Sequence, residues 1–361
     1  MKKVAIIGAG ALGIVSAIML KEDFEVTLIE KNNKIGKKIL ASGNGKCNFT
    51  NVGSFENKYN NEFAYNIVNK FTSEDTLKFF SSLGLVYKMD EENRVYPLSE
   101  TSVTVLDVLK KHLKGVRILL DSKVNRMVLN DDGVEIFYKD TIESFDYVIC
   151  ASGSCASNLG SEYAYSYLRS IDIKISELKA SLSPVIVQED LSLISGVRCK
   201  CLVNLYKDGK FLYKEAGEVL FKDNSLSGIV ILNISSVINR EKGKYKVCLD
   251  LSYGAQNYDM SFDLLGVVHP KIREYMEINK LNDPTCLEFN VVSTSKYDNG
   301  QVISGGVEIS ELNNDLSLRK DKRVYLGGEL IDCDGMCGGY NLQFAFSCAK
   351  VISESIKKAN Q

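Results

Sequence analysis

Gly8-Ala9-Gly10-Ala11-Leu12-Gly13, a GxGxxG motif, decides the fold of this chain because of what stands on either side of it. The apolar run Val4–Ile7 before the motif predicts a buried strand, and Ile14–Leu20 after it predicts a helix packed on that strand. Glu30 closes the next expected strand, 20 residues beyond Gly10. A strand, a glycine turn, a helix and a second strand ending in an acid predict a Rossmann-type dinucleotide-binding unit.

Each glycine of the motif meets a separate physical demand of such a unit. Gly8 permits a tight turn, Gly10 lets the backbone approach a pyrophosphate, and Gly13 lets the helix and the strand pack closely. The N–H groups at the start of the helix would hold the anion, and Glu30 would accept hydrogen bonds from the adenosine ribose. An acid at this place disfavours NADP but leaves NAD and FAD open. A purely structural glycine turn is the alternative.

The first twenty residues also resemble a signal peptide or a short membrane anchor, since Lys2 and Lys3 precede the apolar run Val4–Leu20. The run is short for a spanning helix and contains three glycines, and Lys21-Glu22-Asp23 follows it in place of a small-residue cleavage site. A strand, a turn and a helix explain it better. We therefore expect no membrane association.

Length and composition are those of an ordinary globular protein with two domains. The chain has 361 residues, more than one hydrophobic core usually serves, with 45% hydrophobic and 25% charged residues. Lys and Arg number 44 against 46 Asp and Glu, a net charge of −2. Such a balanced chain carries no overall field that would attract nucleic acid or anionic lipid. A small-molecule substrate is expected, and nucleic acid is not.

The ten cysteines are scattered along the chain and show no paired spacing. Cys150, Cys248 and Cys348 lie in apolar runs, where a reduced cysteine behaves as a small core hydrophobe. Reduced thiols and a cytoplasmic location are therefore expected. Four further cysteines could supply half of a zinc site, namely Cys199 with Cys201 and Cys333 with Cys337. No metal site is predicted, because neither pair has CxxC spacing and the only two histidines are distant in sequence.

Hydrophobic periodicity outlines the remaining elements. Helices are expected at Ser73–Leu83 with a serine cap, Val103–Leu113, Lys271–Ile278 and Asn341–Lys357. Strands are expected at Glu25–Glu30, Val124–Leu129, Val134–Tyr138, Asp146–Cys150 and Arg323–Leu326. Between Ser183 and Ser252 the chain reads mostly as strands without βαβ order, at Val185–Val187, Cys201–Tyr206, Phe211–Tyr213 and Val247–Leu251. That stretch predicts an antiparallel sheet or a small barrel.

Two segments are specific enough to indicate a family. They are Lys37–Asn51, which reads KKILASGNGKCNFTN, and Gly338-Gly339-Tyr340-Asn341-Leu342-Gln343. Weaker motifs occur in matching order at Asn93–Pro97, Ala151–Gly153, Gly217–Phe221, Ser304–Val307 and Gly328–Gly335. From residue 4 to about residue 350 the chain resembles the BaiN/RdsA-type NAD(P)/FAD-dependent oxidoreductases, the aminoacetone oxidase-like flavoproteins. It is identified as a shortened and divergent member.

The resemblance implies an α/β fold: a glutathione-reductase-like Rossmann FAD-binding domain with an inserted antiparallel β-barrel-like domain and a reduced helical subdomain. The expected FAD-binding domain is discontinuous, residues 1–180 and 315–361. The inserted β-rich substrate domain is expected at 181–314, with the helical remnant at 253–295.

The resemblance also implies which residues meet FAD. For the ADP half they are Gly8 to Gly13, Glu30, Lys31, Val124, Ala151, Ser152 and Gly153. For the pyrophosphate and ribityl chain they are Lys38, Ser42, Gly43, Gly328, Glu329 and Asp334. Around the flavin they are Cys47, Asn48, Gly338, Gly339, Tyr340 and Asn341. The Gly338–Asn341 turn would place a helix N-terminus against the flavin, where its dipole favours the negative charge of the reduced ring; a plain structural turn is the alternative.

Several departures from the family pattern bear on the chemistry. Disulfide reductases carry two cysteines five residues apart, whereas Val52 stands at that spacing from Cys47. No second GxGxxG occurs, so NAD(P)H, if it is the reductant, would bind transiently at the flavin face. The family's SYP and THxGLSGP motifs are altered at residues 154–156 and 222–229, and the helical subdomain is short. Substrate specificity therefore does not transfer with the resemblance.

The leading hypothesis is an FAD-dependent oxidoreductase that transfers hydride between flavin N5 and a small or hydrophobic organic substrate. It would either reduce an activated double bond, with NAD(P)H as the donor, or oxidise an amine with oxygen. Tyr340 as a proton donor and Cys47 as a flavin neighbour are the weak catalytic candidates. The alternatives are a flavoprotein without turnover and one that acts on RNA. The RNA alternative draws on the lysines near the cofactor loop, Lys31, Lys34, Lys37, Lys38 and Lys46.

Overall fold

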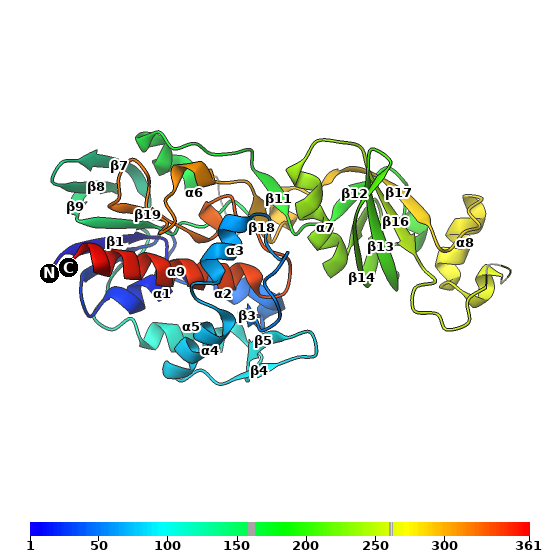
Figure 1. The fold of residues 1–361 in the computed structure, drawn as a ribbon, viewed down its shortest axis with the longest axis horizontal. Helices are drawn as coiled ribbons and strands as arrows, with labels where there is room; N and C mark the ends of the chain where they lie inside the picture. Colours follow the sequence, from blue (N-terminus) through cyan, green and yellow to red (C-terminus); the bar gives the residue numbers. More distant parts are fainter. Residues whose placement is uncertain (158–162, 260, 262) are drawn as a thin grey trace. The chain divides into compact units, whose positions relative to one another are not determined.

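The computed structural model describes residues 1–157, 163–259, 261 and 263–361, which form two compact units. Unit 1 comprises Met1–Leu178 and Gly305–Gln361, and unit 2 is the inserted segment Lys179–Ser304 (Figure 1). The second boundary lies at residue 305, before the expected 315, because Val307 pairs with strand-like segments of unit 1 at Ile175 and Ile331.

A five-stranded parallel sheet forms the centre of unit 1, in the order β19-β10-β1-β2-β6. Its strands are β1 (Lys3–Ile7), β2 (Glu25–Ile29), β6 (Arg117–Leu119), β10 (Tyr147–Cys150) and β19 (Val324–Leu326). Residues 4–6 and 148–150 have no exposed surface. Continuous apolar strands of this kind are typical of parallel sheets covered on both faces.

Helices α1 (Ala11–Leu20) and α9 (Tyr340–Ala359) pack against each other beside this sheet (Figure 1). Gly327 permits their close approach to the chain after β19, because a Cβ there would lie 2.8 Å from Cβ of Cys348 on α9. The shorter helices of unit 1 are α2 (Lys37–Ala41), α3 (Glu62–Val68), α4 (Ser73–Ser82), α5 (Ser102–Lys111) and α6 (Tyr163–Ser166). Thr72 caps α4 in place of the expected serine, in a capping box with Asp75.

Two small antiparallel sheets complete unit 1. One contains β7 (Val124–Asn130), β8 (Gly133–Tyr138) and β9 (Thr141–Phe145), and the other contains β3 (Thr50–Asn51), β4 (Tyr87–Met89) and β5 (Arg94–Pro97). The second sheet holds the end of the segment Lys37–Asn51 against the body of the unit, since β3 pairs with β5.

Unit 2 is a closed antiparallel barrel in the order β12-β15-β14-β13-β16-β17. Its strands are β12 (Val185–Val187), β13 (Arg198–Lys207), β14 (Lys210–Lys222), β15 (Ser225–Ser227), β16 (Tyr245–Asp250) and β17 (Leu287–Thr294), with β11 (Lys179–Ser181) and β18 (Val302–Ser304) forming a separate pair. Val203, Phe221, Val247 and Phe289 fill the barrel core. The expected Rossmann fold with an inserted antiparallel barrel is thus confirmed.

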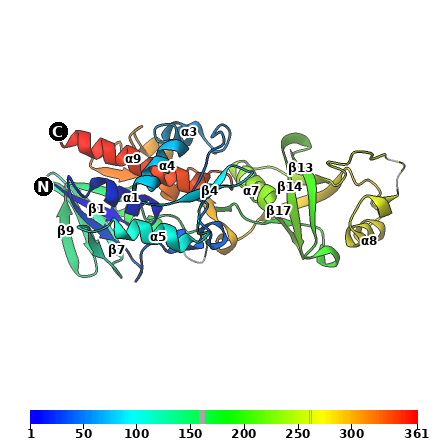
Figure 2. The ribbon, with the colours of Figure 1, turned by 90° about the horizontal axis from the view of Figure 1, so that it is seen from below.

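Two helices accompany the barrel and lie on opposite sides of it (Figures 1 and 2). α7 (Ile229–Arg240) was not expected, because the stretch around it reads mostly as strands; its apolar residues Val230, Ile231, Ile234 and Ile238 follow helical spacing. α8 (Pro270–Ile278) lies where a short helix is expected. The expected helical remnant, 253–295, extends too far toward the C-terminus, because the barrel strand β17 already begins at residue 287. Residues 260 and 262 of this segment lie outside the described residues.

The N-terminal apolar run divides into β1, a turn and α1, and within the described part of the chain no helix is long and apolar enough to cross a membrane. One expectation about the cysteines is wrong. Cys248 is bonded to Cys286, 38 residues further on, although the sequence spacing suggests no pairing.

Candidate functional site

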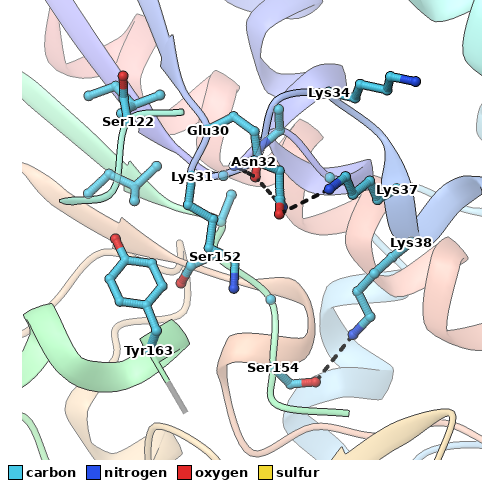
Figure 3. A pocket seen from close by; sticks show the side chains of 17 residues that line it. Glu30, Lys31, Asn32, Lys34, Lys37, Lys38, Ser122, Ser152, Ser154 and Tyr163 are labelled. Carbon is cyan, nitrogen blue, oxygen red and sulfur yellow. Dashed lines mark hydrogen bonds between the residues drawn. The ribbon is translucent and has the colours of Figure 1, made fainter. Parts of the chain in front are cut away.

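A pocket opens at the carboxyl ends of β1, β2 and β10, where ligands of open α/β sheets bind (Figure 3). Four segments supply most of its wall: the β1–α1 turn, the end of β2 with the loop after it, the start of α2, and the turn after β10. The lining residues are Ile7–Gly10, Ile29–Asn32, Lys34, Lys37, Lys38, Ser122, Ala151–Ser154 and Tyr163.

The three glycines of the β1–α1 turn differ in what surrounds them. Gly8 has a φ of +108°, and a Cβ there would lie 2.3 Å from the carbonyl oxygen of Ala151. A Cβ on Gly13 would lie 1.9 Å from the carbonyl oxygen of Gly8. A Cβ on Gly10, in contrast, would have no heavy atom of the described residues within 4 Å. Gly8 and Gly13 are therefore required by packing, whereas the space beside Gly10 at the start of α1 is open among the described residues.

Glu30 stands at the end of β2 with its carboxylate turned toward this turn. Its side chain accepts hydrogen bonds from the backbone N–H of Ala9 at 2.8 Å, from the backbone N–H of Asn32 at 2.9 Å and from the Asn32 amide at 2.6 Å. Glu30 is only 7% exposed. A buried acid held by two backbone donors is fixed in place, so it can present an oxygen to a hydroxyl group in the pocket.

Lysines form much of the polar wall, and each has a different surrounding. The ammonium groups of Lys31 and Lys123 lie over the ring of Tyr163, at 5.3 and 4.5 Å from its centre. Burial lowers the pKa of Lys31 more than the neighbouring Glu30 raises it. Lys37 donates a hydrogen bond to the Asn32 side chain at 3.3 Å.

Lys38 joins two segments that are far apart in the sequence. Its ammonium group pairs with the carboxylate of Glu329 at 2.5 Å and approaches the Ser154 hydroxyl at 3.4 Å, and that hydroxyl also donates to Glu329 at 2.8 Å. Glu329 lies in the short 3-10 turn Gly328–Leu330 after β19. Two residues that the sequence assigns to the same stretch of cofactor are thus in direct contact.

The segment after α2 follows a path that few residue types tolerate. Gly43, Asn44, Gly45 and Cys47 all have positive φ, and a Cβ on Gly43 would lie 2.7 Å from the backbone nitrogen of Asn48. Cys47 has no exposed surface, and burial raises the pKa of its thiol to about 11. The thiol is protonated at neutral pH, which favours a packed cysteine over a reactive one.

The turn before α9 lies against this segment. Gly338 and Gly339 have φ of +120° and +97°, and Gly339 is the N-cap of α9, with no side-chain cap. A Cβ on Gly339 would lie 2.6 Å from the carbonyl oxygen of Thr50 and 2.8 Å from Oδ1 of Asn48. That Oδ1 atom is buried and has no hydrogen-bond partner among the described residues. An unsatisfied buried acceptor is costly, and a bound ligand is one way to satisfy it.

The two residues that begin α9 have contacts within the protein. The Asn341 side chain accepts from the backbone N–H of Gly335 at 2.9 Å and donates to its carbonyl at 2.8 Å, so it clamps the preceding loop. The Tyr340 ring makes edge contacts with Phe55 and Tyr59, and burial raises the pKa of its hydroxyl. Neither contact by itself indicates a catalytic role.

The remaining sequence-derived candidates are also in unit 1. The Val124 carbonyl accepts a hydrogen bond from the Tyr163 hydroxyl, and the Ser152 hydroxyl donates to the Ala164 carbonyl at 2.9 Å. Gly153 has a φ of +73° and open space where a Cβ would stand. Three more candidates pack or bond away from the pocket: Ser42, whose hydroxyl donates to Ile39; Gly328, whose N–H faces Cys348; and Asp334, which is buried and bonded to Asn60 through its backbone.

The sequence alone does not mark six of the polar pocket residues as cofactor contacts. In sequence, Lys34 and Lys37 stand out only as part of a basic cluster, and Ser154 only as a departure from the family motif. Asn32, Ser122 and Tyr163 carry no local pattern that could have marked them. They reach the pocket because separate chain segments meet at one edge of the sheet.

Comparison with known proteins identifies the relatives of this chain. The profile of the HI0933-like protein Rossmann domain matches residues 2–355. A 3-dehydro-bile acid delta(4,6)-reductase of Clostridium scindens is 31% identical, over 96% of this chain and 97% of its own length. A protein of Haemophilus influenzae named ribosomal RNA dihydrouridine synthase is 25% identical, over 98% of both chains.

Solved structures agree on the fold. A flavocytochrome c3 fumarate reductase in its open conformation superimposes with a TM-score of 0.53 at 15% identity, over 99% of this chain and 78% of that one. A 3-ketosteroid-delta4-(5alpha)-dehydrogenase from Rhodococcus jostii RHA1 gives 0.50 at 11% identity, over 98% and 97%. With the family profile matched along nearly its whole length, the chain belongs to the HI0933-like family, the BaiN/RdsA-type flavoproteins, and is an FAD-dependent oxidoreductase.

Proposed function

We propose that this protein reduces a carbon–carbon double bond conjugated with a carbonyl group, using FAD and taking electrons from NAD(P)H. The observation that carries the proposal is a property shared by its relatives. A delta(4,6)-reductase of a 3-dehydro-bile acid and a dihydrouridine synthase, by their names, both add hydrogen across a ring double bond that is conjugated with a carbonyl. Substrates of these two kinds differ greatly in size, so the proposal rests on the chemistry that they share.

The pocket of unit 1 fits the ADP half of FAD. Open space beside Gly10 at the start of α1 suits a pyrophosphate, since the first N–H groups of a helix bind anions. The fixed carboxylate of Glu30 suits the ribose hydroxyls. Lys38 lies on the pocket wall and pairs with Glu329. The Lys38 ammonium group suits the negatively charged pyrophosphate, and the Glu329 carboxylate suits the neutral ribityl hydroxyls.

The flavin end would lie against the Gly338–Gly339 turn. When bound, FAD supplies hydride transfer at N5. The protein contributes the unpaired Oδ1 of Asn48, which would accept a hydrogen bond from the ring, and the N-terminus of the 20-residue helix α9, whose dipole favours negative charge. Burial raises the pKa of the Cys47 thiol to about 11 and raises that of the Tyr340 hydroxyl, so both groups would be protonated beside the flavin at neutral pH.

An anaerobic titration of the FAD-loaded protein with NADH and then NADPH tests the donor. We expect one nucleotide to bleach the visible flavin band, and a conjugated enone then to restore it, with an isolated alkene as the control that does not. A flavin that neither nucleotide bleaches, but an amine does, would replace the reductase with an amine oxidase. Protein that takes up no FAD would overturn the cofactor assignment itself.

An RNA uracil ring is the second candidate substrate, because two relatives named ribosomal RNA dihydrouridine synthase, from Haemophilus influenzae and Escherichia coli, match 98% and 97% of this chain. RNA binding would weaken steeply with salt, since each neutralised phosphate releases counterions. Filter binding at low and high salt measures this slope. Absence of binding at low salt would eliminate this candidate and leave small enones.

A further inference from the structure

Cys248 and Cys286 join the two ends of a long excursion from the barrel of unit 2. Cys248 lies on β16, and Cys286 stands one residue before β17. The two strands are neighbours, with Leu249 opposite Leu287 and Cys248 opposite Glu288. The Cα atoms of the two cysteines are 5.3 Å apart, within the range that a disulfide spans. The two cysteines are thus diagonal neighbours where β17 begins beside β16.

The chain between them leaves and re-enters the barrel at this point. It carries the 3-10 turn Leu264–Gly266 and helix α8. Backbone contacts close its base as well, since the N–H of Leu251 donates to the carbonyl of Pro284 at 2.8 Å. The sulfur–sulfur bond therefore adds a covalent link to a base that backbone pairing already closes.

The two thiols differ in access. Cys248 is 2% exposed, whereas Cys286 is only partly buried, with its sulfur 4.0 Å from a carboxylate oxygen of Glu288. Glu288 pairs with Lys246 at 2.8 Å, and both side chains are about half exposed. Cys286 consequently faces the solvent side of the strand pair, and a reagent from solution reaches it first.

We propose that Cys248 and Cys286 are a site of reversible thiol–disulfide exchange with a small-molecule disulfide, entered through Cys286. The Cys286 thiolate attacks one sulfur of the small disulfide, forming a mixed disulfide and releasing one small thiolate. The Cys248 thiolate then attacks the Cys286 sulfur and displaces the second small thiolate. Two protein thiols are oxidised to one disulfide, one small disulfide is reduced to two thiols, and the two protons pass to water or to the released thiolates.

The test uses the full-length protein, reduced and then exposed to glutathione disulfide. Intact-mass measurement should show the loss of two hydrogen atoms, and a non-reducing peptide map should show one cross-linked peptide containing both cysteines. Cys286→Ser should lose the cross-link. Cys199→Ser should keep it, because Cys199 is also partly buried but lies on β13, outside the segment from β16 to the start of β17 that carries Cys248 and Cys286.

A second readout follows the excursion itself. Proteolytic cleavage between the two cysteines should leave one covalent species on a non-reducing gel of the oxidised protein and two fragments after reduction. The proposal is overturned if Cys286 retains a glutathionyl group without the second exchange, if neither thiol reacts, or if Cys286→Ser still forms a link to Cys248. None of these outcomes depends on whether the flavin assignment holds.

Discussion

Replacing Gly10 by alanine separates cofactor binding from folding at the β1–α1 turn. The backbone of Gly10 is extended, with φ −90° and ψ −161°, and no heavy atom of the described chain lies within 4 Å of an added Cβ. Alanine fits there without strain, so the apoprotein should keep its stability or gain about 0.4–1 kcal/mol from a less flexible unfolded chain. The methyl group would, however, occupy the space assigned to the pyrophosphate.

The loss of affinity follows from the contacts that the methyl group prevents. A hydrogen bond to a charged group contributes about 1.5–3 kcal/mol, and about 1.4 kcal/mol corresponds to a tenfold change in Kd. Displacing the pyrophosphate from one backbone N–H should therefore raise the Kd of FAD by about 10- to 150-fold. Titration of the apoprotein with FAD, followed by the change in flavin fluorescence, measures this directly.

Gly13→Ala is the matched control, because its Cβ would lie 1.9 Å from the carbonyl oxygen of Gly8. Relieving such an overlap costs about 1–3 kcal/mol, so the apoprotein Tm should fall by about 2–6 °C. Gly10→Ala should thus lower the affinity for FAD without lowering the apoprotein Tm, and Gly13→Ala should lower the Tm. If Gly10→Ala binds FAD as tightly as the original protein, the space beside Gly10 is not the pyrophosphate site.

Three further predictions concern other groups. Glu30→Gln should weaken FAD binding about 10- to 100-fold through loss of the charged acceptor, measured by the same titration; an unchanged Kd would remove Glu30 from the site. Burial raises the pKa of the Cys47 thiol from near 9 to about 11. The contribution of this thiol to folding stability is therefore complete below pH 9 and is lost as the pH rises toward 11. The denaturant midpoint should fall less steeply between pH 9 and 11 in Cys47→Ala than in the original protein, and an equal fall in the two proteins would refute the shift. The Cys248–Cys286 bond closes 38 residues of chain, so oxidised protein should exceed reduced protein in unfolding free energy by up to about 4 kcal/mol; Cys286→Ser should show no such difference.

The sequence predicts the β1–α1–β2 unit well because most of its signals are local. The turn glycines, the strand before them and Glu30 lie within one β1–α1–β2 unit, and the packing requirement at Gly13 comes from Gly8 within the same turn, whereas that at Gly8 comes from the distant Ala151. Gly8 and Gly13 are needed for packing and Gly10 for open space, as their added-Cβ contacts show. An apolar run interrupted by three closely spaced glycines, as in residues 4–20, favours a strand, a turn and a helix over one continuous helix.

The elements that the sequence missed depend on partners distant in the chain. Helix α7 lies within a run of strands, and its apolar spacing competes with the strand signals on either side. Cys248 meets Cys286 only because β16 pairs with the start of β17, and no pattern in the nearby sequence predicts that pairing. Tyr163 enters the pocket only because the segment after β10 returns to β7, where its hydroxyl meets the Val124 carbonyl.

The lysines after β2 show why placement matters more than a count of charges. In sequence they form one basic cluster that could face a polyanion, but in the pocket their surroundings differ. Lys38 is neutralised by Glu329, which lies 291 positions away, Lys37 is hydrogen-bonded to a neighbouring side chain, and Lys31 lies over an aromatic ring. Lys34 extends away from these three in Figure 3. Three of the four pocket lysines thus serve contacts inside unit 1, so this cluster would supply few of the phosphate contacts that a steep salt dependence of RNA binding requires.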